Sequence, residues 1–334
     1  MGKDTVRRKS SRSTNHSRRK SPAYTESYSL DEKREIAHQI RAYTDLDLVT
    51  DYQRLCEIGC GAKDTHIRNR AGNKVVDSFT FFERLNTVGK KGLSFYQLWK
   101  HRRAFADKSY VRGFVRFSRK KVGEKNETKM WYNLYRFYFS SINLFRPLVA
   151  MEYYCRYRPT CVLDFTMGWG GRLVGACALH VHKYIGIDEN VHLKRPYRDM
   201  RAFLIAQGTQ TEMDLRFENA LDVDYSKIDY DMVFTSPPYY NIEIYGGKPS
   251  RYQTKDEWDE AFYRPLFSKT YQHMQAGGHY GLNIPSDVYE RVCVGLFGKA
   301  TQRFLLKKMD KGTKKNAKTP SKTYVEYVYV WKKT

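Results

Sequence analysis

The residues best suited to chemistry form a short polar and aromatic turn after an apolar run. Residues 231–240 read Asp-Met-Val-Phe-Thr-Ser-Pro-Pro-Tyr-Tyr. Two successive prolines fix the backbone φ angles and remove two N–H donors. What remains is an array of acceptors. The hydroxyl of Ser236 and the carbonyl of Pro237 can accept hydrogen bonds from an amino group, and Tyr239 offers a face to a planar ring.

A second candidate is a glycine-rich turn between an acidic residue and an apolar helix. Residues 162–171 read Val-Leu-Asp-Phe-Thr-Met-Gly-Trp-Gly-Gly, and the segment 173–179 is mainly apolar. Glycines at such a place let backbone amides approach a ligand closely at the switch point of a parallel sheet. Taken alone, this turn also suits dinucleotide binding, which is the commoner use of such turns.

Together, the two turns resemble those of the DNA amino-methyltransferase family, which depends on S-adenosylmethionine. The family's motif is [Asp/Asn/Ser]-Pro-Pro-[Tyr/Phe/Trp], matched here by Ser236, Pro237, Pro238 and Tyr239. The resemblance implies that these four residues catalyse methyl transfer to an exocyclic amino nitrogen of a base, cytosine N4 or adenine N6. It extends over residues 142–334 in one consistent order.

The glycine turn departs from the family's form at several positions. The family's turn is Asp-Pro-Phe-x-Gly-[Ser/Thr]-Gly-Thr, and this chain differs at Phe165, Thr166, Trp169 and Gly171 while keeping the glycine spacing. Trp169 is the departure that bears most on cofactor binding. It favours one alternative, a catalytically inactive nucleic-acid-binding subunit with a methyltransferase fold. An RNA base amino-methyltransferase is the other alternative, since similar turns serve amines in RNA.

Further cofactor contacts follow from the same resemblance. Asp188 is expected at the ribose of S-adenosylmethionine, Asn219 or Asp222 near its adenine, and a Phe-x-Pro element within 143–147 at its methionine end, where Arg146 could pair with the carboxylate. Helix capping is the alternative role for the three polar residues. The implied cofactor-binding residues are Phe145, Arg146, Pro147, Asp164, Thr166, Gly168, Trp169, Gly170, Asp188, Asn219, Asp222 and Thr235.

These turns require a sheet that brings their strand ends together. Short apolar runs alternate with helical segments, which predicts βαβ units and a mainly parallel, doubly wound sheet. The expected strands are 161–165, 184–188, 215–219, 231–235 and 279–284, with a closing antiparallel ribbon at 303–308 and 324–331 and an amphipathic helix at 258–274. The fold class is thus α/β, a Rossmann-like methyltransferase sheet.

Upstream of this domain, the sequence predicts two other regions. Residues 1–28 read as a disordered basic tail, because they contain almost no apolar side chains. Residues 29–140 are expected to be helical and basic, starting at a capping box formed by Ser29 and Glu32 and including helices at 93–105 and 130–139. Since 141–334 lacks a large target-recognition domain, the helical region is expected to recognise the target.

One stretch of the helical region alternates aromatic and basic residues. It spans 110–121 and includes Phe114, Arg116, Phe117 and Arg119. Rings that stack on bases and arginines that neutralise phosphates would suit nucleic-acid contact. A half-buried strand with an exposed cationic face is the other interpretation, and the sequence leaves both open.

The composition of the chain limits the classes of molecule that it is expected to bind and the place where it is expected to act. The formal charge of +23 indicates a polyanion, and nucleic acid, with DNA favoured over RNA, is the expected partner. No apolar stretch approaches the length of a bilayer span, so we expect a soluble intracellular protein, nuclear or cytoplasmic. The six cysteines do not resemble a secreted disulfide framework, so reduced thiols and no metal are expected. The glycine signature at residues 56–61 follows no buried strand and is interpreted as an ordinary turn.

Overall fold

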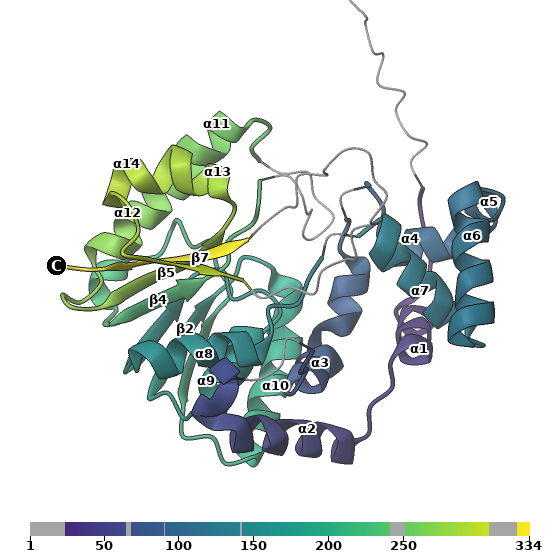
Figure 1. The fold of residues 1–334 in the computed structure, drawn as a ribbon, viewed down its shortest axis with the longest axis horizontal. Coiled ribbons are helices and arrows are strands. Elements are labelled where there is room, and N and C mark those ends of the chain that lie inside the picture. The colour runs from purple at the N-terminus through teal and green to yellow at the C-terminus, as the bar shows by residue number, and fades with distance from the viewer. Residues whose placement is uncertain (1–23, 65–67, 90, 141, 241–250, 307–325) are drawn as a thin grey trace, which may run out of the picture.

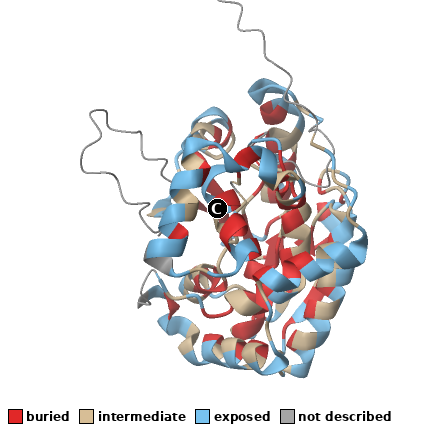
Figure 2. Cartoon of the chain, turned by 90° about the vertical axis from the view of Figure 1, so that its right-hand side faces the viewer, coloured by how far each residue is buried: buried red, intermediate tan, exposed pale blue. Residues whose placement is uncertain are grey.

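A computed structural model describes residues 24–64, 68–89, 91–140, 142–240, 251–306 and 326–334. It consists of a sheet flanked by helices, with a further group of N-terminal helices beside it (Figure 1). Buried residues line the inward faces of the helices, and exposed residues cover the outside (Figure 2). Most of the expected basic tail lies outside the described residues.

Seven strands form one mixed sheet in the order β3-β2-β1-β4-β5-β7-β6. Strands β1 to β5 pair in parallel, and β7 runs antiparallel between β5 and β6. The strands are β1 (Cys161–Asp164), β2 (Lys183–Ile187), β3 (Glu212–Arg216), β4 (Met232–Thr235), β5 (His279–Ile284), β6 (Gln302–Leu305) and β7 (Tyr327–Lys332). The predicted α/β fold with a closing antiparallel strand is confirmed.

The two edge strands differ from the sequence prediction in position. The third strand was expected at 215–219 but lies at Glu212–Arg216, and the ribbon strand expected at 303–308 is β6, Gln302–Leu305. In β3 only Met213 is buried, and no residue of β6 is. Because an edge strand lacks a continuous apolar run, hydrophobicity locates its ends poorly.

Successive residues of the central strands enter different cores, as expected for a pleated sheet covered on both faces. Val162 of β1 belongs to one core cluster and Leu163 to the other. The first core is covered by α2 (Asp45–Ile58), η1 (Gly59–Asp64), α3 (Asn73–Asn86), α8 (Pro147–Tyr157), α9 (Gly171–Ala178) and α10 (Lys194–Ala206).

The opposite face is covered by the helices that follow β4 and β5. The expected helix at 258–274 is present but divided, with a π-helical turn in its first half. These elements are α11 (Lys255–Trp258), η6 (Asp259–Tyr263), α12 (Arg264–Gln272), α13 (Ser286–Val288), η7 (Tyr289–Cys293) and α14 (Val294–Phe297). Short 3-10 turns precede α10 and β4, at η3 (Val191–Leu193) and η4 (Tyr225–Lys227).

The remaining N-terminal helices form a third core of their own. They are α1 (Leu30–Ile40), α4 (Phe95–Lys100), α5 (Arg102–Ala106), α6 (Ser109–Phe117), η2 (Ser118–Val122) and α7 (Glu127–Tyr138). Helix α3 joins the two parts, because it contacts α1 and α4 on one side and α9 and α10 on the other. The helical region expected over 29–140 is therefore divided, with α2 and α3 packed on the sheet.

Two predictions for this region have clear outcomes. The capping box is confirmed: the hydroxyl of Ser29 accepts from the N–H of Glu32, and the Glu32 carboxylate accepts from the N–H of Ser29. The strand interpretation of 110–121 is wrong, because these residues form α6 and η2. Tyr110, Phe114 and Phe117 recur at helical spacing, and this periodicity prevails over the local alternation.

The expectation of reduced thiols is wrong for one pair of cysteines. Cys60 in η1 and Cys155 in α8 form a disulfide, with their Cα atoms 5.5 Å apart, whereas the other four cysteines are free. The two residues are 95 positions apart, so their pairing depends on the packing of η1 against α8, which local spacing does not reveal.

No helix among the described residues is both long and apolar enough to cross a membrane. In the same residues, no three His, Cys, Asp or Glu side chains gather in a way that could hold a metal ion.

Candidate active site

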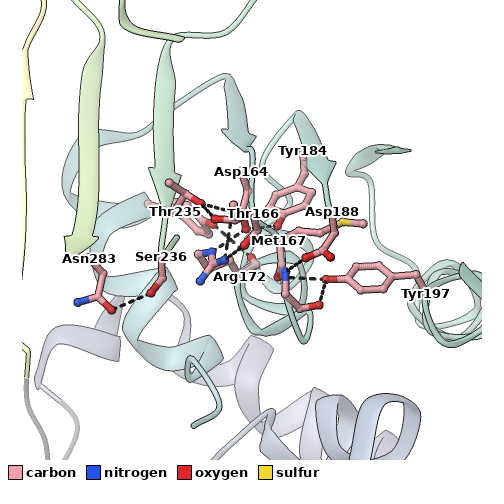
Figure 3. Close-up of polar contacts among 12 residues, drawn as sticks. Asp164, Thr166, Met167, Arg172, Tyr184, Asp188, Tyr197, Thr235, Ser236 and Asn283 are labelled. Atoms are coloured by element: carbon pink, nitrogen blue, oxygen red, sulfur yellow. Dashed lines mark hydrogen bonds and ion pairs between the residues drawn. The ribbon is translucent and has the colours of Figure 1, made fainter. Parts of the chain in front are cut away.

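The glycine-rich turn and the Pro-Pro turn lie side by side at the carboxyl ends of β1 and β4. These strands pair directly, with Leu163 opposite Val233. The hydroxyl oxygens of Thr166 and Thr235, one from each turn, are 2.6 Å apart (Figure 3). The close approach that the sequence analysis requires is therefore present.

A buried network beneath the turns fixes this arrangement. The carboxylate of Asp164 is 0% exposed and accepts from Arg172 Nε at 2.6 Å, Tyr184 OH at 2.5 Å and Thr235 Oγ1 at 2.7 Å. Burial opposes the charged form of Arg172, but Asp164 overcomes it, and the pKa of Arg172 is raised. The guanidinium also donates to the carbonyl of Thr166. Asp164 and Arg172 therefore hold the first residues of the glycine-rich turn in place.

The same network sets the direction of the threonine hydroxyls. The carboxylate of Asp164 can only accept, so Thr235 must donate its proton there. Thr166 then donates to Thr235. The remaining lone pairs of Thr166, which is half-buried, are left to accept from a ligand group such as an ammonium.

Each glycine of the glycine-rich turn is required for its own physical reason. Gly168 and Gly170 have φ angles of +55° and +91°, which favour glycine. Among the described residues, a Cβ added at Gly168 would meet only the Thr166 carbonyl oxygen, at 3.8 Å, so no described atom crowds that side of Gly168. A Cβ added at Gly171 would lie 1.8 Å from the carbonyl oxygen of Phe145. The turn can therefore carry no side chain at the point where the 143–147 segment crosses it.

The 143–147 segment packs on the glycine-rich turn, while its expected contact with the methionine end of a cofactor stays a prediction. The ring of Phe145 makes an edge contact with Phe234 at 5.7 Å, and Arg172 lies over it at 5.0 Å. Pro147 begins α8. Burial and the nearby Arg70 lower the pKa of Arg146. An anion such as a carboxylate would stabilise two arginines placed in this way.

Trp169 lies inside the protein. It is 7% exposed and belongs to the core cluster that includes Val76 of α3 and Met200 of α10. Its carbonyl accepts a hydrogen bond from the hydroxyl of Thr80 in α3. The departure from the family pattern is thus accommodated by packing between helices, and α3 contributes to the shape of the cofactor turn.

Asp188 follows β2 and faces the same turn. Its Oδ2 accepts from the N–H of Gly168 at 2.9 Å, and its Oδ1 accepts from the N–H of Asn190 at 2.9 Å. Burial raises the pKa of Asp188 to about 6. Each carboxylate oxygen keeps a lone pair that could accept from a diol. Tyr197 completes the support, because its hydroxyl donates to the carbonyls of Met167 and Gly168.

Asn219 and Asp222 lie in the turn after β3, beside the end of β2. Asn219 is half-buried, and its Oδ1 accepts from the N–H of Leu221, while Asp222 is exposed. Neither residue caps a helix, because the next helical turn, η4, is capped by Asp224. The contact of Asn219 with Leu221 closes a turn and leaves its amide Nδ2 separate from the oxygen that accepts.

The hydroxyl of Ser236 is oriented by a residue that the sequence analysis missed, Asn283 of β5. Asn283 is 2% exposed, and its Nδ2 donates to the carbonyl of Tyr327, which turns Oδ1 toward the Pro-Pro turn. Ser236 Oγ lies 3.2 Å from that oxygen (Figure 3), and Tyr239 OH lies 3.0 Å from it. Both hydroxyls can donate to Asn283, and they also lie 3.3 Å from each other, where either could be the donor. With both protons directed at Asn283, the lone pairs of Ser236 are left as acceptors.

The outer side of the Pro-Pro turn is fixed by Tyr263 of η6, which was also missed. Its buried hydroxyl donates to the carbonyl of Pro238 and accepts from the N–H of Tyr240. Tyr240 has a φ of +52°, an unusual conformation for a tyrosine. Pro237 is buried, and no described residue donates to its carbonyl. That carbonyl remains an acceptor for a ligand.

Only weak signals in the sequence pointed to the missed residues. Asn283 is a lone amide in an apolar strand, and Arg172 is a lone charge at the start of an apolar helix. Such isolated polar residues in buried elements require partners. Tyr263 carries no comparable signal, because it lies among other aromatic residues in an amphipathic segment.

Other features singled out in the sequence lie elsewhere. Residues 241–250, which follow the Pro-Pro turn directly, and residues 307–325, between the two strands of the closing ribbon, lie outside the described residues. The glycine signature at 56–61 lies at the end of α2 and in the 3-10 helix η1, with no strand before it, so it is not the glycine turn of a βα unit, and the expected turn is the end of a helix.

No family model matches the chain, and no curated protein matches its sequence. Solved structures similar to it include TrmN from Thermus thermophilus, at 15% identity and a TM-score of 0.40, over 56% of this chain and 49% of that one. An rRNA methylase from Streptococcus thermophilus has 15% identity and a TM-score of 0.34, over 52% and 87%. TehB from Haemophilus influenzae has 10% identity and a TM-score of 0.35, over 66% of each chain. The chain thus spans about half the length of TrmN, and these similarities carry no argument about activity.

Proposed function

We propose that the chain is an S-adenosylmethionine-dependent methyltransferase that modifies an exocyclic amino nitrogen of a nucleic-acid base, with DNA cytosine N4 or adenine N6 favoured. The observation that carries the proposal is the direct contact between the two turns, Thr166 to Thr235. It places the acceptors of the Pro-Pro turn beside a glycine turn that no described atom crowds at Gly168. A donor and an acceptor of a methyl group could meet there.

The residues around the glycine turn fit the cofactor. Asp188 offers carboxylate lone pairs for a ribose diol, and Gly168 leaves room for a ligand. We assign the methionine end to Thr166 and Arg146 and the adenine to Asn219 or Asp222. Asp164 and Thr235, whose polar atoms are buried in the network, are assigned to positioning the turn. When bound, S-adenosylmethionine supplies an electrophilic methyl group on a sulfonium.

The Pro-Pro turn is proposed to activate the substrate amine. An aromatic amine is a poor nucleophile because its lone pair is delocalised into the ring. Ser236 Oγ and the Pro237 carbonyl would each accept a hydrogen bond from one N–H of the amine. These two bonds would draw the nitrogen toward tetrahedral geometry and concentrate the lone pair on it. Asn283 supports this role because it receives the hydroxyl proton of Ser236. Positioning for attack supplies much of the remaining rate enhancement.

Tyr239 and Pro238 have different assignments within the turn. The ring of Tyr239 is held through its hydroxyl by Asn283 and is proposed to stack on the target base. Pro238 fixes the turn, because its carbonyl is occupied by Tyr263. If the substrate is a duplex, the target base must leave the helix, which costs a few kcal/mol, and stacking on Tyr239 would offset part of that cost.

The experiment is methyl transfer to defined substrates, followed by mass spectrometry of the nucleosides. The full chain is incubated with S-adenosylmethionine and either DNA or RNA, which separates the two substrates and identifies the base. We expect Ser236→Ala and Tyr239→Ala to lower transfer by about 100-fold or more, whereas Ser268→Ala, at an exposed position of α12, leaves it unchanged.

Calorimetry with S-adenosylmethionine separates an enzyme from an inactive subunit. The burial of Trp169 in the core supports binding. No binding by the full chain, or full transfer by Ser236→Ala, would contradict the proposed function.

A further inference from the structure

Exposed aromatic side chains gather on α6 and at the end of α7. Phe117 is 57% exposed, Phe137 is 62% exposed and Tyr138 is 37% exposed. In the described part of the chain, these are the only aromatic side chains classed as exposed. Exposed apolar side chains that stand singly need no explanation, but a contiguous group of them marks an interaction surface.

The rings form a preorganised cluster. Phe114 of α6 contacts both Phe137 and Tyr138 of α7, each at 6.2 Å between ring centroids, and Tyr110 contacts Tyr138 at 4.9 Å. Val111, which is 1% exposed, anchors α6 in the helical core. We call Phe114, Phe117, Phe137 and Tyr138 the stacking surface. Little ordering of Phe114, Phe137 and Tyr138 is left for a ligand to impose, and Phe117 lies one helical turn after Phe114 on α6.

The helical region that carries the stacking surface is strongly basic. Residues 102–136 contain eleven Lys and Arg against three Asp and Glu. Two of the acidic residues are engaged, Glu127 with Arg102 and Glu124 with Lys129. Arg112, Arg116 and Arg119 of α6 and η2 are exposed, and none of them forms an ion pair with a described carboxylate.

We propose that the stacking surface binds unpaired nucleotides of single-stranded nucleic acid, with bases stacked on its rings and phosphates of the same strand neutralised by the exposed arginines on the adjoining faces of α6 and η2. Base-to-ring stacking tolerates any sequence because every base has a π face. A duplex conceals those faces and presents only base edges and phosphates. The exposed rings of the stacking surface, in a helical region rich in Lys and Arg, therefore fit an unpaired strand and do not fit a duplex groove.

Helices α6 and α7, which carry the surface, lie in the N-terminal group of helices, away from strands β2 and β4 of the sheet (Figure 1). Its place in methyl transfer, as the part of the enzyme that holds the strand next to a target base, rests on the proposed function. The binding itself does not depend on that function. The two are therefore tested by separate readouts.

The test measures fluorescence anisotropy of labelled oligothymidylate with the full chain and without cofactor, because oligothymidylate cannot pair with itself. The main variant is Phe117→Leu with Phe137→Leu, which keeps apolar area and net charge but removes two π faces. We expect its affinity to fall by about tenfold or more, from roughly 1–3 kcal/mol of stacking per base and 1.4 kcal/mol per factor of ten. Affinity for a 20-base-pair duplex is expected to change by less than about twofold.

Arginine variants give an independent readout of phosphate contact. Replacing Arg112, Arg116 and Arg119 with glutamine should reduce the slope of log affinity against log salt by about 2, from roughly 0.7 per phosphate contact on a single strand. For the ring replacements, the matched control is Leu305→Ala, which changes an apolar side chain that is 60% exposed in the sheet. This control should leave the affinity for oligothymidylate unchanged. Oligouridylate replaces oligothymidylate in a parallel series that reports whether the sugar matters, and tighter binding of either supports the proposal.

Full affinity of the Phe117→Leu, Phe137→Leu variant for oligothymidylate would overturn the proposal. Ring-dependent binding to vesicles of anionic phospholipid, without ring-dependent binding to oligothymidylate or oligouridylate, would overturn it in favour of a membrane surface. The control Ser268→Ala, at an exposed position of α12, should bind the oligonucleotide like the unmodified chain. If the unmodified chain transfers no methyl group but its oligonucleotide binding still depends on the rings, only the proposed function is rejected.

Discussion

Replacing Asn283 with leucine tests whether a buried amide directs the chemistry of Ser236. Leucine has a similar size but cannot accept from Ser236 and Tyr239 or donate to Tyr327, the three hydrogen bonds that Asn283 makes. The hydroxyl of Ser236 would then be free to rotate and to point its proton at the incoming amine. The acceptor that should draw protons from the nitrogen would be lost for much of the time.

The size of the effect follows from the contacts that are lost. Misdirecting one hydrogen bond to a reacting group costs roughly 1–3 kcal/mol, so kcat/KM should fall by about 5- to 150-fold. The free energy of unfolding in urea should fall by about 2–4 kcal/mol, because three hydrogen bonds disappear at a residue that is 2% exposed. The Kd for S-adenosylmethionine should change by less than about twofold, because Asn283 makes no contact with the glycine turn.

A double-mutant cycle provides the decisive assay. If Asn283 acts through Ser236, the leucine substitution in a Ser236→Ala background should lower kcat/KM by no more than about threefold. Additive losses from the two substitutions would refute the positioning role and leave Asn283 as a residue that only stabilises β5. Initial rates with the best oligonucleotide substrate, at saturating cofactor, provide the comparison.

Three further predictions concern the cofactor turn and the disulfide. Gly171→Ala should abolish measurable cofactor binding in calorimetry and destabilise the fold by about 1–3 kcal/mol, because its Cβ would lie 1.8 Å from the Phe145 carbonyl oxygen; normal binding would contradict the close crossing. Burial raises the pKa of Asp188 to about 6, so protonation removes the acceptor for a ribose diol, and affinity for S-adenosylmethionine should fall as pH decreases from 7.5 to 5; an unchanged Kd over that range would rule out this contact. Dithiothreitol should lower the free energy of unfolding by about 2–4 kcal/mol, because Cys60 and Cys155 close a loop across 95 positions. Cys60→Ser should remove that sensitivity and Cys56→Ser should retain it.

Strands in the middle of the sheet were predictable from the sequence, whereas edge elements were less so. β1, β2, β4 and β5 are buried on both faces, so each appears as an apolar run within two residues of its observed ends. β3 has one buried residue and was misplaced by three positions. The 110–121 stretch was open between two interpretations because a short segment of alternating aromatic and basic residues carries both periodicities.

Residues within each turn were found from the sequence because a turn is local. Ser236 to Tyr239 are consecutive, and the glycine spacing of 168–171 follows from backbone constraints at those positions. Their partners were not found. Tyr263 and Asn283 are 25 and 47 residues away from the atoms that they hold, and no local pattern records such a contact.

By itself, the sequence determined the α/β class, the order of the turns and the types of side chain that each turn presents, because propensity, periodicity and proline or glycine geometry act over a few residues. Only the tertiary structure decided that Asp164 is enclosed by Arg172, Tyr184 and Thr235, that Trp169 is packed against α3 and α10, and that Asn283 receives the proton of Ser236. Each of these depends on the pairing of strands and the packing of helices that are distant in the chain. Direction of hydrogen bonding, burial and hence pKa are set by those distant neighbours and not by the residue's own position in the sequence.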